Sequence, residues 1–236
     1  MDLSHDTLIL GVVWFAVFLF STTLHEASHA FMARRLGDPT AYLGGQVTLN
    51  PVPHIRREPF GMVVVPLLSF LFSGWMFGWA SAPFDPRWAR RHPRRSAGMA
   101  LAGPASNLAL VVLAGLLIRL GFILGTFHAP ESITFSRVTA SSAGPGVVGL
   151  ATLLSVLFTL NLVLFVFNLL PLPPLDGSAV VQLFMSDGLA RRYQELIRQP
   201  AVSWIGILIA WRLIGYVFQP IHLLAINLLY PGFGYG

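Results

Sequence analysis

The chain has 236 residues, of which 55% are hydrophobic and 11% are charged, and its formal net charge is +5. Soluble domains carry roughly a quarter charged residues, and the mean hydropathy here is high, at +0.69. These values exclude an ordinary soluble domain and indicate an integral, multi-pass membrane protein. The absence of cysteine excludes disulfides, thiolate metal sites and cysteine nucleophiles. All 15 basic residues are arginine. This usage suggests a prokaryotic cell membrane, and the lack of any basic-aromatic module predicts no nucleic-acid partner.

Residues 8–33 are predicted to form the first membrane span, because this apolar run is long enough to cross about 30 Å of hydrocarbon. Asp2 and Asp6 precede it, so no cleavable secretory signal is expected. Arg34 and Arg35 follow it directly. Under the positive-inside rule, the end of this span that carries the arginines faces the cytoplasm.

The same span contains the sequence HEASH, in which two histidines stand four residues apart. On a helix, His25 and His29 differ by about 40° around the axis and about 6 Å along it, so both rings can bind one metal from a single face. Glu26 follows the first histidine and can act as a general base toward water, as in H-E-x-x-H zinc proteases. Three ionisable residues in an apolar span are costly unless they pair or bind a metal.

The next two segments are predicted to be short elements at the membrane. Residues 41–49 contain adjacent glycines and indicate an extended segment or β-hairpin that can pair with an unfolded substrate. Residues 60–82 are apolar but are interrupted by glycines and a proline. Arginines lie in the loops on both sides of this segment, which favours a re-entrant segment over a full crossing.

The rest of the chain predicts three further hydrophobic segments, at 97–124, 147–170 and 201–229. The fold class expected is therefore an all-α polytopic bundle of about five to six hydrophobic segments. It would have a three-helix catalytic core and form a single membrane-embedded domain over 1–236. After the 147–170 span comes the sequence NLLPLPPLDG, whose prolines cannot continue a regular helix. Unwound backbone at membrane depth is tolerated only around a cavity or a protein-lined groove.

A catalytic zinc ion usually has three protein ligands and one open position, so a third ligand is needed besides the two histidines. Asp176 is favoured, because it lies at the proline-rich break near the cytoplasmic end of its span, at about the depth expected for His29. The histidines considered instead are His54, His92, His128 and His222. Each of these is placed less well, either in a loop, among arginines, on the outer side or in the last segment.

The motifs HExxH at 25–29 and NLLPLPPLDG at 168–177 together resemble the site-2 protease family of intramembrane zinc metalloproteases. The sequence GPASN at 103–107 is also similar to that family. The resemblance extends from about residue 20 to about residue 180, and it points to the short subgroup without PDZ or CBS domains.

This resemblance implies one zinc ion per chain bound by His25, His29 and Asp176, with Glu26 activating a water molecule. Asn107 and Asn168 would orient the substrate or stabilise the oxyanion, or else form hydrogen bonds between helices. The expected activity is regulated intramembrane proteolysis of transmembrane protein substrates in the lipid bilayer, with the active site towards the cytoplasm. A metal transporter, an inactive scaffold and a zinc enzyme acting on lipids or prenylated peptides remain alternatives, and the oligomeric state is open.

Overall fold

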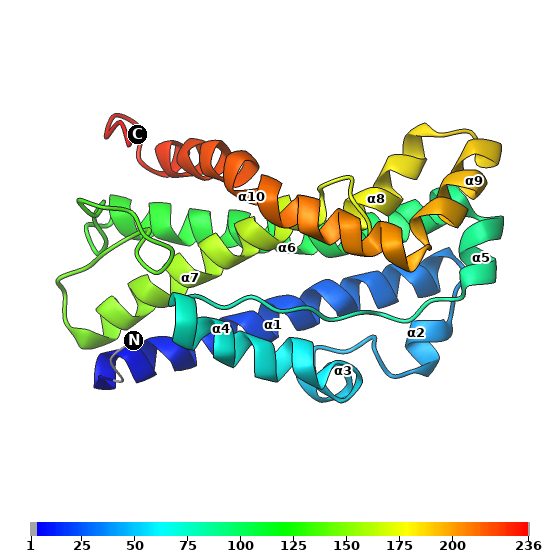
Figure 1. The fold of residues 1–236 in the computed structure, drawn as a ribbon. Coiled ribbons are helices and arrows are strands. Elements are labelled where there is room, and N and C mark those ends of the chain that lie inside the picture. Colours follow the sequence, from blue (N-terminus) through cyan, green and yellow to red (C-terminus); the bar gives the residue numbers. More distant parts are fainter. Residues whose placement is uncertain (1–3, 236) are drawn as a thin grey trace.

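The structure, a computed structural model, describes residues 4–235, and within them it is helical and contains no β-strand (Figure 1). Four helices are long and apolar enough to cross a membrane: α1 (His5–Leu36), α6 (Pro93–Ile123), α7 (Pro145–Asn168) and α10 (Pro200–Leu229). They coincide with the four spans predicted at 8–33, 97–124, 147–170 and 201–229. The all-α class and the multi-pass bundle are therefore confirmed.

Shorter helical elements connect these four helices. They are α2 (Thr40–Leu43), α3 (Pro51–Arg57), a π-helical turn (Phe60–Val64), α4 (Val65–Ser73), α5 (Pro86–Arg91), α8 (Asp176–Val180), a 3-10 turn (Val181–Phe184) and α9 (Asp187–Ile197).

Local chemistry sets where the helices begin and end. A proline occupies the first position of α3, α5, α6, α7 and α10, where its missing N–H is not needed and its fixed φ suits a helix. Ser4 caps the start of α1, and its hydroxyl accepts a hydrogen bond from the backbone N–H of Thr7. Gly37 caps the end of α1 and adopts a φ of 105°, a conformation that glycine tolerates best.

In the bundle, α6 and α7 lie between α10 on one side and α1 with α4 on the other (Figure 1). One apolar cluster joins α6, α7 and α10 and includes Phe158 and Ile226. A second joins α1, α4 and α7 and includes Trp14 and Phe70. Between the clusters, where α1, α6 and α7 meet, the buried side chains are polar, and this is where the candidate site lies.

The β-hairpin predicted over residues 41–49 is wrong. Ala41 lies in the short helix α2, and the backbone N–H groups that follow donate to nearby carbonyls. Gly44 donates to Thr40 over 3.1 Å and Gln46 donates to Ala41 over 2.9 Å. These local bonds leave no ladder for a second strand.

The re-entrant segment expected over 60–82 is not supported either. Its helical part ends at Ser73, where Gly74 takes a φ of 77°, and the following residues are extended and lie against the protein. Met76 is fully buried with Trp14 and Phe18, and the N–H of Trp79 donates to the carbonyl of Gly61 over 3.1 Å. Packing against α1 and the π-helical turn thus determines the path of this segment.

Candidate metal centre

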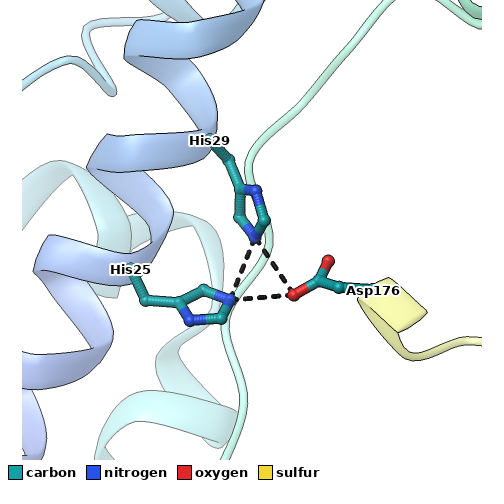
Figure 2. A group of neighbouring side chains, drawn as sticks. All are labelled: His25, His29 and Asp176. Carbon is teal, nitrogen blue, oxygen red and sulfur yellow. Dashed lines mark hydrogen bonds and ion pairs between the residues drawn. The ribbon is translucent and has the colours of Figure 1, made fainter. Parts of the chain in front are cut away.

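Two histidines of α1 and the first residue of α8 form a compact group of possible metal ligands (Figure 2). The Nε2 atoms of His25 and His29 are 2.9 Å apart. The Oδ2 atom of Asp176 lies 3.1 Å from the first and 3.2 Å from the second. Among residues 4–235, this is the group of His, Asp or Glu side chains whose possible ligand atoms lie close enough together to bind one metal ion. All three predicted ligands are therefore adjacent in the fold, although Asp176 is about 150 residues further along the chain.

The break after α7 brings Asp176 to the histidines. Helix α7 ends at Asn168, the proline-rich loop follows, and α8 starts at Asp176. Close backbone contacts hold this loop. A Cβ atom on Gly177 would lie 2.3 Å from the carbonyl oxygen of Leu170, and a Cβ atom on Gly206 of α10 would lie 1.8 Å from that of Pro173. Only glycine permits these approaches, which hold the start of α8 against the residues that follow α7 and hold the proline-rich loop against α10.

Hydrogen bonds orient both imidazole rings. Nδ1 of His29 donates to the backbone carbonyl of Met99 over 2.8 Å, and a carbonyl oxygen can only accept. Nδ1 of His25 is 2.5 Å from the Oδ1 atom of Asn107, so this nitrogen is also the donor. In a neutral imidazole the other nitrogen then carries a lone pair. Both rings therefore present an unprotonated Nε2 to the space they share with Asp176.

The carboxylate of Asp176 completes this set. Its Oδ2 atom lies within 3.2 Å of the Nε2 atoms of both histidines. Two imidazole lone pairs and a carboxylate oxygen within 3.2 Å repel one another unless a cation lies between them. Two nitrogen ligands and one oxygen ligand are a donor set typical of catalytic zinc.

Gly103 of α6 leaves the room that a metal ion needs. A Cβ atom at this position would lie 2.3 Å from Nε2 of His29 and 2.5 Å from Nε2 of His25. The backbone of α6 thus approaches the two ligand atoms as closely as a residue without a side chain allows. This space, together with the donor set, fits a bound zinc ion.

Glu26 lies beside the metal ligands in a small polar cavity of about 60 Å³. The cavity is lined by Thr22, His25, Glu26, Gly78, Ala80, Leu164 and Asn168. Glu26 is itself buried. One amide hydrogen of Asn168 is used locally, because its Nδ2 donates to the carbonyl of Leu164 over 3.0 Å. The structure therefore brings Glu26 and Asn168, two predicted site residues, to the same cavity as His25.

Asn107, the other predicted asparagine, has a different position. It is fully buried, with its Oδ1 at His25 and its Nδ2 donating to the Oδ1 of Asn161 over 2.8 Å. Both ends of its amide are thus occupied inside the bundle. This asparagine faces a metal ligand and a neighbouring helix, which is the geometry of a hydrogen bond between helices, the second of the two roles expected for it.

The remaining histidines weighed as third ligands lie elsewhere. His54 in α3 faces the carbonyl of Thr48, and His92 stands before α6 close to the ring of Trp88. His128 pairs with Ala140 in the loop between α6 and α7. His222 stacks on Phe218 within α10.

Three residues at the site were not singled out as site residues by their sequence: Met99, Gly103 and Asn161. Met99 acts through its backbone carbonyl, which no side-chain pattern reveals. Gly103 belongs to the sequence GPASN, whose resemblance to the family assigned no role to this glycine. Asn161 is a lone amide in an apolar span. Because a polar side chain is energetically costly there, its presence could have indicated a role at the site.

A second, larger cavity lies on the neighbouring flank of α1. It is an apolar groove of about 570 Å³ between α1, α6 and the segment 47–49. Leu24 and Ser28, which line it, immediately precede His25 and His29 in the chain. The groove therefore runs alongside the helix that carries the two histidines.

Two histidines one turn apart, a facing carboxylate and a glutamate beside a polar cavity, all inside a bundle of membrane-length helices, define a membrane-embedded metal-dependent hydrolase. The sequence model of "Peptidase family M50" matches residues 13–213. The chain therefore belongs to peptidase family M50, the site-2 protease family, and it is a zinc metalloprotease.

Curated relatives carry names that agree with this family. The chain is 35% identical to "Putative zinc metalloprotease YwhC" of Bacillus subtilis over 178 residues, and the matched region covers 75% of this chain and 71% of that protein. It is 29% identical over 194 residues to "Putative zinc metalloprotease Rip2" of Mycolicibacterium smegmatis, covering 82% and 63% of the two chains. The protein of the same name from Mycobacterium tuberculosis is 30% identical over 213 residues, covering 89% and 72%. No solved structure matches the chain significantly.

Proposed function

We propose that this chain hydrolyses peptide bonds in or near the transmembrane segments of other membrane proteins, which is the reaction of regulated intramembrane proteolysis. The observation that carries the proposal is the location of the buried His25–His29–Asp176 group, which lies among helices long enough to cross a membrane. A peptide bond must come to that depth to be cut. A substrate already embedded in the bilayer does so without leaving it.

In this proposal one zinc ion per chain is bound by His25, His29 and Asp176. When bound, zinc polarises the scissile carbonyl and lowers the pKa of the attacking water. Glu26 takes the proton from that water and passes it to the leaving amine. Its position in the polar cavity beside His25 supports this role, because a general base must lie within hydrogen-bond reach of the reacting water.

Asn168 supports the charge that develops during attack. Its Nδ2 has two hydrogens, and the carbonyl of Leu164 accepts only one of them. The other is available to donate to an oxygen in the cavity that it shares with Glu26. An amide that donates to the oxyanion in the transition state lowers the barrier.

The apolar groove beside α1 is suited to the neighbouring part of the substrate. Its lining is almost entirely apolar and includes Leu24, Phe31, Leu49 and Ala105. A transmembrane substrate has all its amides hydrogen-bonded and must unwind before attack. Apolar side chains freed by unwinding would then find an apolar surface next to the site.

We also propose that the active site faces the cytoplasm. Ten of the fifteen arginines belong to the end of α1, to α5, to the start of α6 and to α9 or its end. These are residues 34, 35, 87, 90, 91, 94, 95, 191, 192 and 198. Figure 1 shows these elements gathered at one end of the bundle. Excess arginine marks the cytoplasmic side, and His29 lies towards this end of α1.

The test is cleavage of a model transmembrane substrate by the purified protein in liposomes, with zinc content measured on the same samples. The wild type should cut the substrate. Glu26→Gln should retain about one zinc ion per chain and lose cleavage by at least about 100-fold, since general base catalysis contributes about 10²- to 10⁴-fold. A matched control is Glu131→Gln, which changes an exposed glutamate in the loop between α6 and α7 and should cut like the wild type.

The same experiment separates the alternatives. A metal transporter needs ligands but no base, so Glu26→Gln would leave metal flux unchanged while neither protein cut any substrate. An inactive scaffold would show neither cleavage nor flux. Either result from well-folded, zinc-loaded protein would refute the protease proposal for this chain.

A further inference from the structure

A continuous chain of buried polar side chains leads from the metal ligand His25 across the bundle. Asn107 lies next to the ring, Asn161 of α7 follows, and Ser21 of α1 comes last. Nδ2 of Asn107 donates to Oδ1 of Asn161 over 2.8 Å. Nδ2 of Asn161 donates to Oγ of Ser21 over 2.9 Å and to the carbonyl of Leu157 over 2.8 Å. Asn107, Asn161 and Ser21 each have a relative exposure of 0%, so no solvent replaces these partners.

The direction of every bond in this chain is set by one backbone group. The carbonyl of Leu157 can only accept, so the atom of Asn161 next to it must be the amide nitrogen. The oxygen of Asn161 therefore faces Asn107, so Asn107 must donate from its own amide nitrogen. The oxygen of Asn107 is then left for His25, and only an Nδ1 that carries hydrogen satisfies it.

The direction of these hydrogen bonds determines the tautomer of His25. A neutral His25 with hydrogen on Nδ1 presents its lone pair on Nε2, the atom that faces His29 and Asp176. Partners of metal-binding histidines that act in this way typically change metal affinity or activity by about 10- to 100-fold when they are removed. In this chain the orientation comes from two amides in series, on two helices.

We propose that Asn161 is a positioning residue for the zinc site, and that it acts through Asn107 to hold His25 in the tautomer and orientation that bind zinc. This inference rests on the proposed role of His25 as a zinc ligand. Asn161 itself touches neither the ligand atoms nor the cavity of Glu26. Its contribution is to fix the amide of Asn107, which would otherwise rotate and offer its nitrogen to His25.

The experiment is a double-mutant cycle read out as zinc affinity, measured by competition with a chelator on purified full-length protein. Asn161→Leu keeps the volume of the side chain and removes the bonds. It should weaken zinc binding about 10- to 100-fold. In the background of Asn107→Leu the same substitution should cause no further loss, because the path to His25 is already cut.

Two controls match the change. Thr159→Val replaces a fully buried hydroxyl on the same helix that has no partner among the described residues. Asn227→Leu removes an intramembrane asparagine of α10 that likewise donates to the carbonyl four residues before it. Both variants should bind zinc like the wild type. If Asn161→Leu fails to fold, Asn161→Thr keeps a hydroxyl for Leu157 on a shorter side chain, and it should show the same direction of loss.

The outcomes separate this inference from the proposed function. If the wild type binds no zinc, or His25→Ala binds it normally, the metal site itself is refuted. If His25→Ala abolishes binding but Asn161→Leu binds like the wild type, only the positioning role is overturned. Equal losses in both Asn107 backgrounds would also overturn it, because they would show that Asn161 acts through general packing.

Discussion

Substituting Gly103 with alanine adds one methyl group at the point where α6 faces the two histidines. The added Cβ would lie 2.3 Å from Nε2 of His29, whereas Cβ atoms in proteins do not approach heavy atoms closer than 3.0 Å. The ring or the backbone must therefore move by about 0.7 Å. Zinc–ligand distances tolerate only about 0.2 Å, and the ring cannot swing freely because Met99 holds its Nδ1.

We therefore expect Gly103→Ala to weaken zinc binding by about 100-fold or more, at or beyond the upper end of what losing a supporting partner costs. The loss is measured by chelator competition, with cleavage of a membrane substrate measured in parallel. Overpacking should also destabilise the fold by about 1–3 kcal/mol, which thermal unfolding of the zinc-free protein reports separately.

The matched control is Gly98→Ala on the same helix. Its Cβ would meet only the side chain of Leu36, at 3.6 Å, so zinc binding should be unchanged. Alanine in place of a helical glycine should raise stability by about 0.5–1 kcal/mol. If Gly103→Ala binds zinc and cuts like the wild type, α6 does not limit the space at the ligands, and the metal position inferred from this contact is refuted.

Three further predictions concern the loop before Asp176, the bound zinc ion and the apolar groove. Gly206→Ala places a Cβ 1.8 Å from the carbonyl oxygen of Pro173 and should displace the loop before Asp176, lowering both thermal stability and zinc affinity. Gly215→Ala on the same helix meets open space and should change neither. Removing zinc with a chelator should lower the unfolding temperature, because a ligand at about 1,000 times its Kd stabilises a fold by about 4 kcal/mol; an equal unfolding temperature with and without zinc would contradict a folded-state site. Ala105→Phe should fill the apolar groove and slow cleavage of a transmembrane substrate while zinc affinity stays unchanged; undiminished cleavage would remove the groove from the substrate path.

The features predicted correctly from the sequence depend on the length of apolar runs and on the periodicity of a helix. Long apolar runs gave the four membrane-length helices, because crossing the bilayer requires about 20 apolar residues. The spacing of His25 and His29 needed only helical geometry to put both rings on one face. Asp176 was proposed because it lies at the proline-rich break at about the depth expected for His29, and the structure brings its Oδ2 within 3.2 Å of both histidines.

The features that were missed depend on tertiary contacts. The segment 41–49 has the composition of a hairpin. The side chain of Asp38 accepts a hydrogen bond from the backbone N–H of Thr40 over 3.0 Å at the start of the short helix α2, and the backbone groups that follow form local hydrogen bonds. The path of the residues after Gly74 is set by packing against Trp14 and Phe18, which charge counts in the loops do not reveal.

The amide network illustrates the same limit within the site. The motif around Asn107 indicated that the residue belongs near the site, but a motif does not show which way an amide points. Its direction depends on Asn161 and on a carbonyl of another helix, more than fifty residues away. Such a role follows only from the three-dimensional arrangement.

Zinc K-edge X-ray absorption of the purified protein tests whether His25, His29 and Asp176 together bind one zinc ion. We expect about one zinc ion per chain with only nitrogen and oxygen neighbours at about 2.0–2.2 Å and the outer-shell signal of two imidazoles. Asp176→Ala should lose most of the bound zinc under the same conditions. A spectrum with one or three imidazoles, or an unchanged spectrum and zinc content in Asp176→Ala, would show that these three residues do not form the zinc site.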